Sequence, residues 1–293
     1  CWSQGVRPRF AAGCIIRIVQ RPGVTGMTEP LLEVDRVSCY FPIGGGQVLR
    51  AVDDVSLDLQ QGEIVGLVGE SGSGKSTLGK LLIGLNHKSA GTVRLAGREL
   101  PRHYRSRDFR AQSSIVQKIF PEVYSALSPR MTAADIVMEG LRLAQNDRSD
   151  TPGMRAQALA WLERVGLSSQ HMNRYPHEFS GGQRQRLGIA RALALRPQLL
   201  ICDEPVSALD VSVQSQIVNL LESIRREMGI GILFIAHDLS MVRYISDRIA
   251  VMYLGRLVEV GPSRQIFETP AHPYTQALLA SNPVPDPVLE RQR

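Results

Sequence analysis

The sequence predicts an α/β protein in which helices flank a largely parallel sheet. A glycine-rich turn at residues 69–77 joins an apolar strand to a helix, and from Gln183 onward helices and strands alternate as far as Ala236. Such alternation is typical of parallel sheets, because parallel neighbours need a crossover connection between them. With 293 residues and 43% hydrophobic content, the chain is long enough for one large core with a smaller inserted domain.

The first expected strands precede the glycine-rich turn. Apolar residues recur through residues 32–37 and residues 52–59, and three consecutive glycines at 44–46 mark a turn between them. This pattern predicts an N-terminal antiparallel β layer. Beyond the turn, leucines at helical spacing indicate a helix, and two further strands are expected at residues 92–95 and at residues 115–120, where the second ends at Pro121.

The middle of the chain has a helical pattern of apolar residues in place of the preceding strand pattern. Between Thr132 and about Val165, apolar residues recur at helical intervals around the breaker at residues 150–153, which predicts an inserted α-helical subdomain over about residues 122–179. The alternating part that follows contains a helix to Leu195, a strand at residues 199–202, a helix ending at Met228 and a strand at residues 232–236. A short helix bounded by prolines is expected at residues 272–279.

The composition limits the possible ligands and the compartment of the chain, but it does not indicate a function. The chain has 34 Lys and Arg against 28 Asp and Glu, a net charge of +6 and a pI near 9.4, which suits an anionic ligand or a lipid headgroup surface but does not single out nucleic acid. Its longest apolar runs are far shorter than the roughly 18 to 20 residues that a membrane helix needs. The four cysteines (Cys1, Cys14, Cys39 and Cys202) have no metal-ligand spacing, which is consistent with a reducing compartment.

The first 26 residues differ from the rest of the chain. They lack periodicity, begin with Cys1 and precede Met27, which resembles a natural start. We therefore expect residues 1–26 to be a leader that lies outside the fold.

Residues 69–77 read Gly-Glu-Ser-Gly-Ser-Gly-Lys-Ser-Thr and match the pattern G-x-x-x-x-G-K-S. In such a loop, glycines let backbone N–H groups approach phosphate oxygens, and the start of the helix adds positive potential. Lys75 would reach the outer phosphates and the Ser76 hydroxyl would bind Mg²⁺. The sequence therefore predicts that ATP or GTP binds here, and the expected contact residues are Gly69, Ser71, Gly72, Gly74, Lys75, Ser76 and Thr77.

Two adjacent carboxylates, Asp203 and Glu204, follow the apolar strand at residues 199–202. Ligands of open α/β sheets gather at the carboxyl ends of the strands, so both side chains are expected beside the phosphates. Asp203 would hold the hydration shell of Mg²⁺. Glu204 would polarise the water that attacks the γ-phosphate, a general-base role that contributes about 10² to 10⁴ in rate.

A second turn, Ser180-Gly181-Gly182-Gln183, also places a hydroxyl and two glycines ahead of a helix. This arrangement is suited to phosphate as well, although one nucleotide does not need two such turns.

These motifs, followed by residues 207–210 and by residues 235–238, occur in the order found in ABC transporter ATPases, and the chain is similar to that family of P-loop NTPases. The resemblance implies that ATP, with Mg²⁺, is bound between two such domains packed head to tail. The phosphate loop of one domain would face Ser180, Gly182 and Gln183 of the other. It also implies that His237 contacts the γ-phosphate, that Asp210 lies at the dimer seam, and that Phe41 stacks on adenine, with Tyr40 as the alternative.

The resemblance extends to one branch of the family. Residues 175–180, 202–211, 252–255 and 272–279 look like those of the oligopeptide and dipeptide importers, and the similarity runs from about Leu31 to Pro287. It implies an ATPase domain at residues 27–254 and an importer-type extension at residues 255–293. Some relatives carry a cysteine cluster in this extension, whereas this chain has no cysteine after Cys202, so no iron–sulfur centre is expected there.

The same resemblance implies a function and partners. The chain would be the ATPase subunit of an importer for oligopeptides or dipeptides, peripheral to the cytoplasmic face of the cell membrane. Its partners would be two membrane permease subunits, touched through residues 124–130, and a second homologous ATPase subunit in a homodimer or heterodimer. An extracytoplasmic peptide-binding protein would be an indirect partner, and no nucleic acid is expected.

The chain departs from the family pattern at one position. Where family members carry a glutamine that helps to ligate Mg²⁺, Pro121 follows Phe120, and Gln117 lies too early in the strand to replace it. We therefore expect ATP binding to survive and the coupling of hydrolysis to suffer. This departure leaves open a hydrolysis-impaired regulatory subunit in a heterodimer. A soluble ABC ATPase acting on nucleic acid is a further alternative, but the tandem domains or coiled-coil insertions of such proteins are not evident in the sequence.

Overall fold

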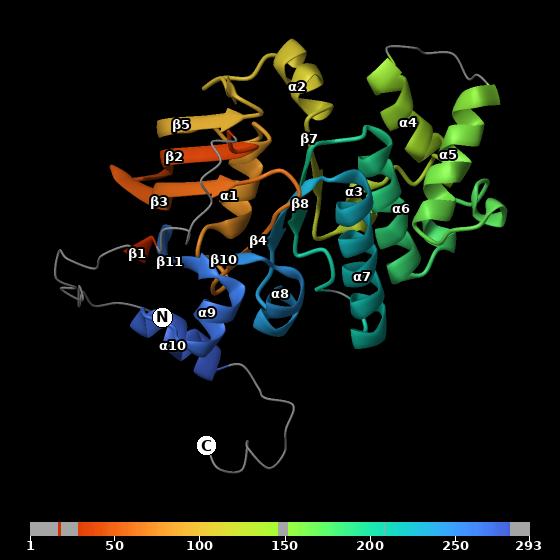
Figure 1. The fold of residues 1–293 in the computed structure, drawn as a ribbon. Coiled ribbons are helices and arrows are strands. Elements are labelled where there is room, and N and C mark those ends of the chain that lie inside the picture. The colour runs from red at the N-terminus through yellow and green to blue at the C-terminus, as the bar shows by residue number, and fades with distance from the viewer. Residues whose placement is uncertain (1–16, 19–28, 146–151, 208, 282–293) are drawn as a thin grey trace, which may run out of the picture.

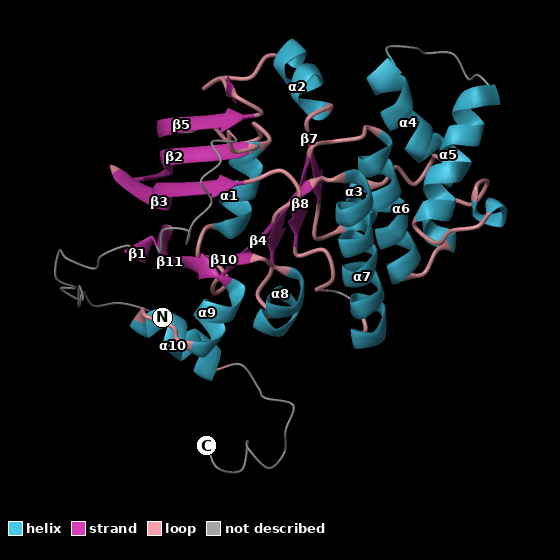
Figure 2. Cartoon of the chain, viewed as in Figure 1, coloured by secondary structure: helices cyan, strands magenta, loops and turns pink. Residues whose placement is uncertain are grey.

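The computed structural model describes residues 17–18, 29–145, 152–207 and 209–281. A seven-stranded mixed sheet forms the centre of the molecule, a four-stranded antiparallel sheet lies on one side of it, and a group of helices lies on the other (Figures 1 and 2). This arrangement confirms the predicted α/β class, the antiparallel N-terminal layer and the mainly helical insertion.

The central sheet has the strand order β1-β11-β10-β4-β9-β8-β7. Its strands are β1 (Arg17–Ile18), β4 (Ile64–Val68), β7 (Val116–Ile119), β8 (Leu199–Asp203), β9 (Gly231–Ile235), β10 (Arg248–Tyr253) and β11 (Arg256–Pro262). From β10 to β7 all neighbours pair in parallel, and only the β10–β11 hairpin is antiparallel. Every residue of β4, β8 and β9 is buried, as expected for parallel strands that are covered on both faces.

The antiparallel sheet has the order β3-β2-β5-β6 and consists of β2 (Leu32–Gly44), β3 (Gln47–Leu59), β5 (Ala90–Leu95) and β6 (Arg98–Glu99). Its first hairpin turns at the predicted glycines 44–46, all of which have positive φ. Strand β4 shows how the molecule is layered. Val65 and Leu67 join the apolar cluster of the antiparallel sheet, whereas Ile64 and Val68 join the cluster of the helical side, because successive strand residues face opposite ways.

The helices lie on both sides of the central sheet. They are α1 (Lys75–Leu82), α2 (Ser106–Ser113), α3 (Val123–Ala126), α4 (Ala133–Gln145), α5 (Pro152–Arg164), α6 (Gly181–Ala194), α7 (Val211–Met228), α8 (Leu239–Ile245), α9 (Ser263–Glu268) and α10 (Pro273–Ala280), with short 3₁₀ turns at Ser169–His171 and Pro176–Glu178. Helices α4 and α5 pack against α6 through Met138, Trp161 and Leu187, which belong to one buried cluster. No helix within the described residues has the length and apolar character that crossing a membrane requires.

The expected leader needs one correction. Arg17 and Ile18, which fall within residues 1–26, form strand β1 and pair in parallel with Glu259 and Val260 of β11. A sheet edge offers unpaired backbone groups, so a short passing segment can join it without any sequence pattern of its own. The remaining leader residues lie outside the described part of the chain.

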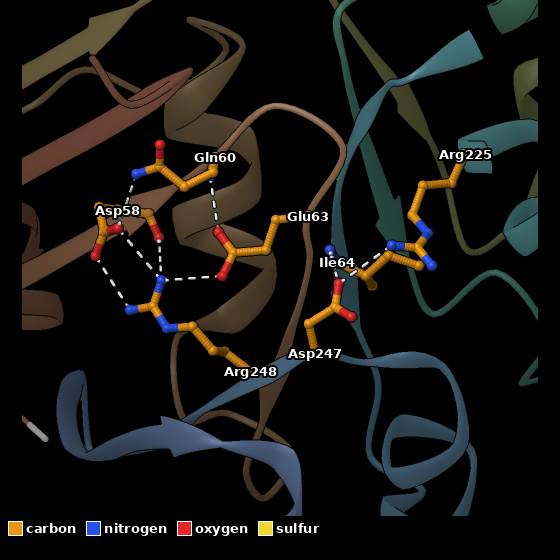
Figure 3. A network of polar contacts seen from close by, with 7 residues as sticks. All are labelled: Asp58, Gln60, Glu63, Ile64, Arg225, Asp247 and Arg248. Carbon is orange, nitrogen blue, oxygen red and sulfur yellow. Dashed lines mark hydrogen bonds and ion pairs between the residues drawn. The ribbon is translucent and has the colours of Figure 1, made fainter. Parts of the chain in front are cut away.

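A network of polar contacts holds the start of β4 (Figure 3). Arg248, the first residue of β10, donates to Asp58 at 3.1 Å and 3.2 Å and to Glu63 at 3.2 Å. Asp247 accepts from the backbone N–H of Ile64 at 2.9 Å and from Arg225 at 3.4 Å. These contacts tie the end of β3, the start of β4, the start of β10 and helix α7 together at the edge opposite the glycine-rich turn.

Candidate nucleotide-binding site

The glycine-rich turn leaves the carboxyl end of β4 and enters α1 at Lys75, with Gly74 as the N-cap residue. Gly69 and Gly74 have φ values of 149° and 107°, a region that favours glycine. A Cβ atom at Gly69 would lie 2.1 Å from the carbonyl oxygen of Met252, and one at Gly74 would lie 2.1 Å from that of Ala51. Both glycines are therefore required by the close packing of the turn against β3 and β10. Ser71, Gly72, Ser76 and Thr77 lie in the same turn and first helical residues.

Lys75 is held inside the turn. Its ammonium donates to the carbonyl oxygens of Gly69 at 2.7 Å and Glu70 at 2.8 Å, and to the Ser73 hydroxyl at 3.3 Å. The residue is 4% exposed. Burial lowers the pKa of Lys75, against the opposing effect of the Glu204, Asp203 and Glu70 charges. A cation is thus held where the strand meets the helix, the position that a nucleotide-binding loop needs.

Ser76 and Asp203 meet across the gap between α1 and β8. The Ser76 hydroxyl donates to Oδ1 of Asp203 at 3.0 Å, and the Asp203 side chain is 1% exposed. A hydroxyl and a carboxylate are oxygen donors of the type that Mg²⁺ prefers, so these two residues fit that ion by chemistry. The other carboxylate oxygen, Oδ2, lies 2.7 Å from the ammonium of Lys118.

Glu204 and His237 lie together beyond the ends of β8 and β9. Nδ1 of His237 is 3.7 Å from Oε2 of Glu204, and the two side chains are 61% and 31% exposed. Glu204 has a φ of 47°, while its backbone N–H donates to the carbonyl of Ile235 at 2.9 Å. A non-glycine residue in this region is under backbone strain. Strands β4, β9 and β8 are consecutive neighbours, so their carboxyl ends bring Lys75, Asp203, Glu204 and His237 to one edge of the sheet.

The second glycine turn begins α6. Ser180 is its N-cap residue and accepts from the N–H of Gln183 at 3.3 Å, while the Gln183 side chain accepts from the N–H of Ser180 at 3.0 Å. Ser180 and Gly181 are exposed. A Cβ atom at Gly182 would lie 2.5 Å from Val213 in α7, the helix whose N-cap residue is the exposed Asp210. The structure thus places the Ser180 turn beside the Asp210 segment rather than among the groups at the end of β4.

The two aromatic candidates for adenine stacking have different surroundings. The hydroxyl of Tyr40 donates to Asp53 at 2.5 Å, and the guanidinium of Arg50 lies 5.6 Å from its ring centre. Phe41 is half-buried and packs against the apolar cluster of the antiparallel sheet. Because Tyr40 is already engaged by polar partners, these surroundings favour Phe41 for stacking.

A cavity of about 580 Å³ opens beside Ser76 and Asp203, and Lys80, Phe120, Pro121 and Glu122 also line it. Pro121, at the position where the resemblance implies a glutamine, offers no side-chain oxygen to the cavity. Gln117 does not replace it, because its amide donates to the carbonyl of Ser113 at 2.6 Å on the α2 side of the strand.

Two residues of this region were missed by the sequence reasoning. Lys118 faces Asp203, and a charged residue within the otherwise uncharged strand at residues 115–120 was the signal that could have identified it. Tyr274 of α10 accepts a hydrogen bond from the backbone N–H of Glu70 at 3.1 Å. No local pattern could have shown this contact, because it joins residues 204 positions apart.

Comparison with known proteins gives consistent results. Residues 52–207 match the ABC transporter family, and residues 258–293 match the C-terminal region of oligopeptide/dipeptide transporters. The oligopeptide transport ATP-binding protein OppF of Bacillus subtilis (strain 168) is 50% identical over 267 residues, covering 91% of this chain and 87% of OppF. The dipeptide transport ATP-binding protein DppF of Lactococcus lactis subsp. cremoris is 48% identical, covering 91% of this chain and 86% of DppF.

Solved structures show the same architecture. The dimeric ATP-binding cassette MJ0796 in a post-hydrolysis state, bound to ADP and Pi, has a TM-score of 0.71 and 28% identity, covering 80% of this chain and 99% of that chain. The protein cbiO1 of Clostridium perfringens, part of the ABC transporter complex cbiONQ, has a TM-score of 0.72 and 25% identity, covering 83% of this chain and 92% of that chain.

Proposed function

Because the chain belongs to the ABC transporter family and is similar over most of its length to oligopeptide and dipeptide transport ATP-binding proteins, we propose that it energises the import of such peptides by binding and hydrolysing ATP. The observation that carries this proposal is the gathering of Lys75, Asp203, Glu204 and His237 at one edge of the central sheet. The family match makes the chain an ATPase, and these residues are the ones that can act on a triphosphate.

Each group at this edge has a role that its chemistry suits. The turn at residues 69–77 would bind the phosphates through backbone N–H groups, and Lys75 would neutralise their charge. Glu204 would accept a proton from the attacking water, and His237, 3.7 Å from it, would contact the γ-phosphate.

We propose that Mg²⁺ binds together with the nucleotide. Ser76 and Asp203 would hold the ion, which when bound would neutralise charge on the phosphate oxygens. Phe41 would support the adenine ring from the antiparallel sheet.

The exposed Ser180 turn supports a paired arrangement. Ser180, Gly182 and Gln183 would contact the nucleotide of a second ATPase subunit, and the neighbouring Asp210 would lie at the seam between the two. ATP binding would favour the closed pair and hydrolysis its reopening, and this difference in affinity for the two states would drive transport. The similarity to a dimeric cassette is consistent with such pairing.

The chain would consist of an ATPase domain and a C-terminal extension, and part of the ATPase domain would contact the membrane subunits. Residues 27–254 would form the ATPase domain, with the helical subdomain at about residues 122–179, and residues 255–293 would form the importer-type extension. Residues 124–130 would contact two membrane permease subunits, with the chain peripheral to the cytoplasmic face of the membrane. A peptide-binding protein on the other side would deliver the cargo without touching this chain.

ATPase measurements on the chain alone and assembled with its permeases in lipid vesicles would test the function. We expect turnover to rise when the permeases and a peptide-loaded binding protein are present, and to be lost in Lys75→Ala, because that change removes the phosphate-binding cation. Stimulation by single-stranded or double-stranded nucleic acid, in place of stimulation by the permeases, would contradict peptide import.

A further inference from the structure

Lys118 is placed on the same face of the sheet as Asp203. It pairs with Ile201 in the parallel β7–β8 register, and Ile201 and Asp203 share a face because side chains alternate along a strand. Asp203 therefore lies two residues farther along, about 6.6 Å at the usual rise per residue, which a lysine side chain can span. The geometry of two parallel strands thus directs a cation toward the carboxylate expected to support the metal.

The contact is a buried ion pair. Nζ of Lys118 lies 2.7 Å from Oδ2 of Asp203, and each side chain is 1% exposed. Burial lowers the pKa of Lys118 against the opposing effect of Asp203, and Nζ lies 5.2 Å from the centre of the Phe120 ring, within cation–π range. An ammonium in such surroundings depends on a nearby negative charge.

Both oxygens of Asp203 are consequently occupied by chain groups. Oδ1 accepts from Ser76 and Oδ2 faces Lys118, so part of the negative charge that would attract a divalent cation is already balanced within the chain. Pro121 adds no oxygen to the cavity beside Asp203, whose lining includes the cations Lys80 and Arg191 and the carboxylate of Glu122. Asp203 therefore has less negative charge to offer a divalent metal than the motif alone indicates.

We propose that Lys118 is an internal counter-ion for Asp203 that takes over part of the electrostatic role of magnesium, so that this chain binds ATP with little dependence on a divalent metal. The inference rests on the proposed nucleotide-binding function and deepens it. Lys118 acts through Asp203 and is a positioning residue, so the measurable consequence is the metal dependence of binding rather than the rate of hydrolysis.

The test compares the dissociation constant of a fluorescent, ribose-labelled ATP analogue in excess Mg²⁺ and in EDTA, using the full-length chain. For the wild-type chain we expect the two constants to agree within about threefold. In Lys118→Met, which keeps an unbranched chain of similar length, we expect binding in Mg²⁺ to be at least about tenfold tighter than in EDTA, or about 1.4 kcal/mol. Lys80→Met removes an equal charge from the lining of the cavity beside Asp203 but leaves the Lys118–Asp203 ion pair intact, and it should keep the wild-type ratio.

A double variant identifies the group that Lys118 masks. In Lys118→Met/Asp203→Asn the carboxylate is gone as well, so the metal dependence should fall back toward the wild-type value. A tenfold dependence in the wild-type chain would overturn the inference without any variant, and so would a Lys118→Met ratio equal to that of wild type or a double variant that stays metal-dependent. Strong but metal-dependent binding overturns this inference alone, whereas the absence of any ATP binding overturns the proposed ATPase function with it.

Discussion

The two ends of strand β4 carry similar charged groups in different surroundings. At its start, Arg248 makes hydrogen bonds with Asp58 and Glu63, and these raise its pKa even though burial acts to lower it (Figure 3). At its end, burial prevails over the nearby carboxylates and lowers the pKa of Lys75. The structure therefore stabilises the charged form of Arg248 at the start of β4. At the end of β4, keeping Lys75 charged costs free energy. We infer that the first cluster serves stability and that the second is suited to binding an anion.

Glu204→Gln tests the functional end and should have the largest effect. The amide keeps the shape of the side chain but cannot accept a proton, so we expect the ATP turnover of the assembled transporter to fall by about 10² to 10⁴. ATP affinity should persist, because Lys75 and the turn are unchanged. The measurement is phosphate release at saturating ATP, together with binding of a labelled nucleotide.

Glu70→Gln is the matched control, since Glu70 is an exposed carboxylate in the same turn and its hydrogen bonds with Tyr274 and Lys75 are made by its backbone. A Glu204→Gln transporter that hydrolyses ATP at half the wild-type rate would remove Glu204 from the chemistry and leave the end of β4 without a general base.

Arg248→Met tests the structural end. It leaves Asp58 and Glu63 without their shared cation, and we expect the free energy of unfolding to fall by about 2 to 3 kcal/mol. This is less than the cost for a fully buried pair, because the Asp58 side chain is 42% exposed. Urea denaturation followed by circular dichroism measures the change.

Arg264→Met supplies the control for Arg248→Met. Its pair with Glu268 is exposed on both sides, so stability should change by under about 0.5 kcal/mol. If Arg248→Met were as stable as the wild-type chain, the contrast between the two ends of β4 would be lost.

The sequence predicted the residues at the end of β4 better than the contacts at its start. The turn at residues 69–77 and the carboxylates at Asp203 and Glu204 were identified because each motif is local: a strand end, a glycine turn and a helix start are contiguous in sequence. The Arg248 network and the Lys118 pair were not, because each joins strands that are distant along the chain, and their contacts depend on sheet order and register. A tertiary contact of this kind has no short-range pattern.

Fold elements followed the same rule. The buried strands β4, β8 and β9 and the helices α1, α6 and α7 were predicted because burial imposes a regular spacing of apolar residues on the sequence, whereas β10 and β11 were not predicted. Strand β1 was not, since two residues carry no period and pair only because β11 has an open edge. The Ser180 turn was predicted as a phosphate-binding turn, whereas the reciprocal capping by Gln183 became visible only in the structure.

Pro121→Gln tests whether a missing side-chain oxygen limits hydrolysis at the functional end of β4. Glutamine would restore a side-chain oxygen to the cavity beside Ser76 and Asp203, and we expect turnover of the assembled transporter to rise about tenfold or more. Removal of a proline also changes the backbone, so Pro121→Ala is the control, and it should not raise turnover. Unchanged hydrolysis in Pro121→Gln would show that the missing oxygen does not limit the reaction.

Tyr274→Phe should have the smallest effect and tests whether the C-terminal extension supports the end of β4. The Tyr274 ring packs 4.2 Å from that of Tyr253, and phenylalanine keeps this packing while removing the oxygen that accepts from the Glu70 N–H. The loss of one hydrogen bond, about 0.5 to 1.5 kcal/mol, should speed amide hydrogen exchange at Glu70 by about 3- to 10-fold. Tyr244→Phe removes the hydroxyl of an exposed tyrosine on α8 and should leave that exchange unchanged. Equal amide exchange at Glu70 in Tyr274→Phe and the wild-type chain would mean that only β3 and β10 hold the turn. The C-terminal extension would then not support the nucleotide site.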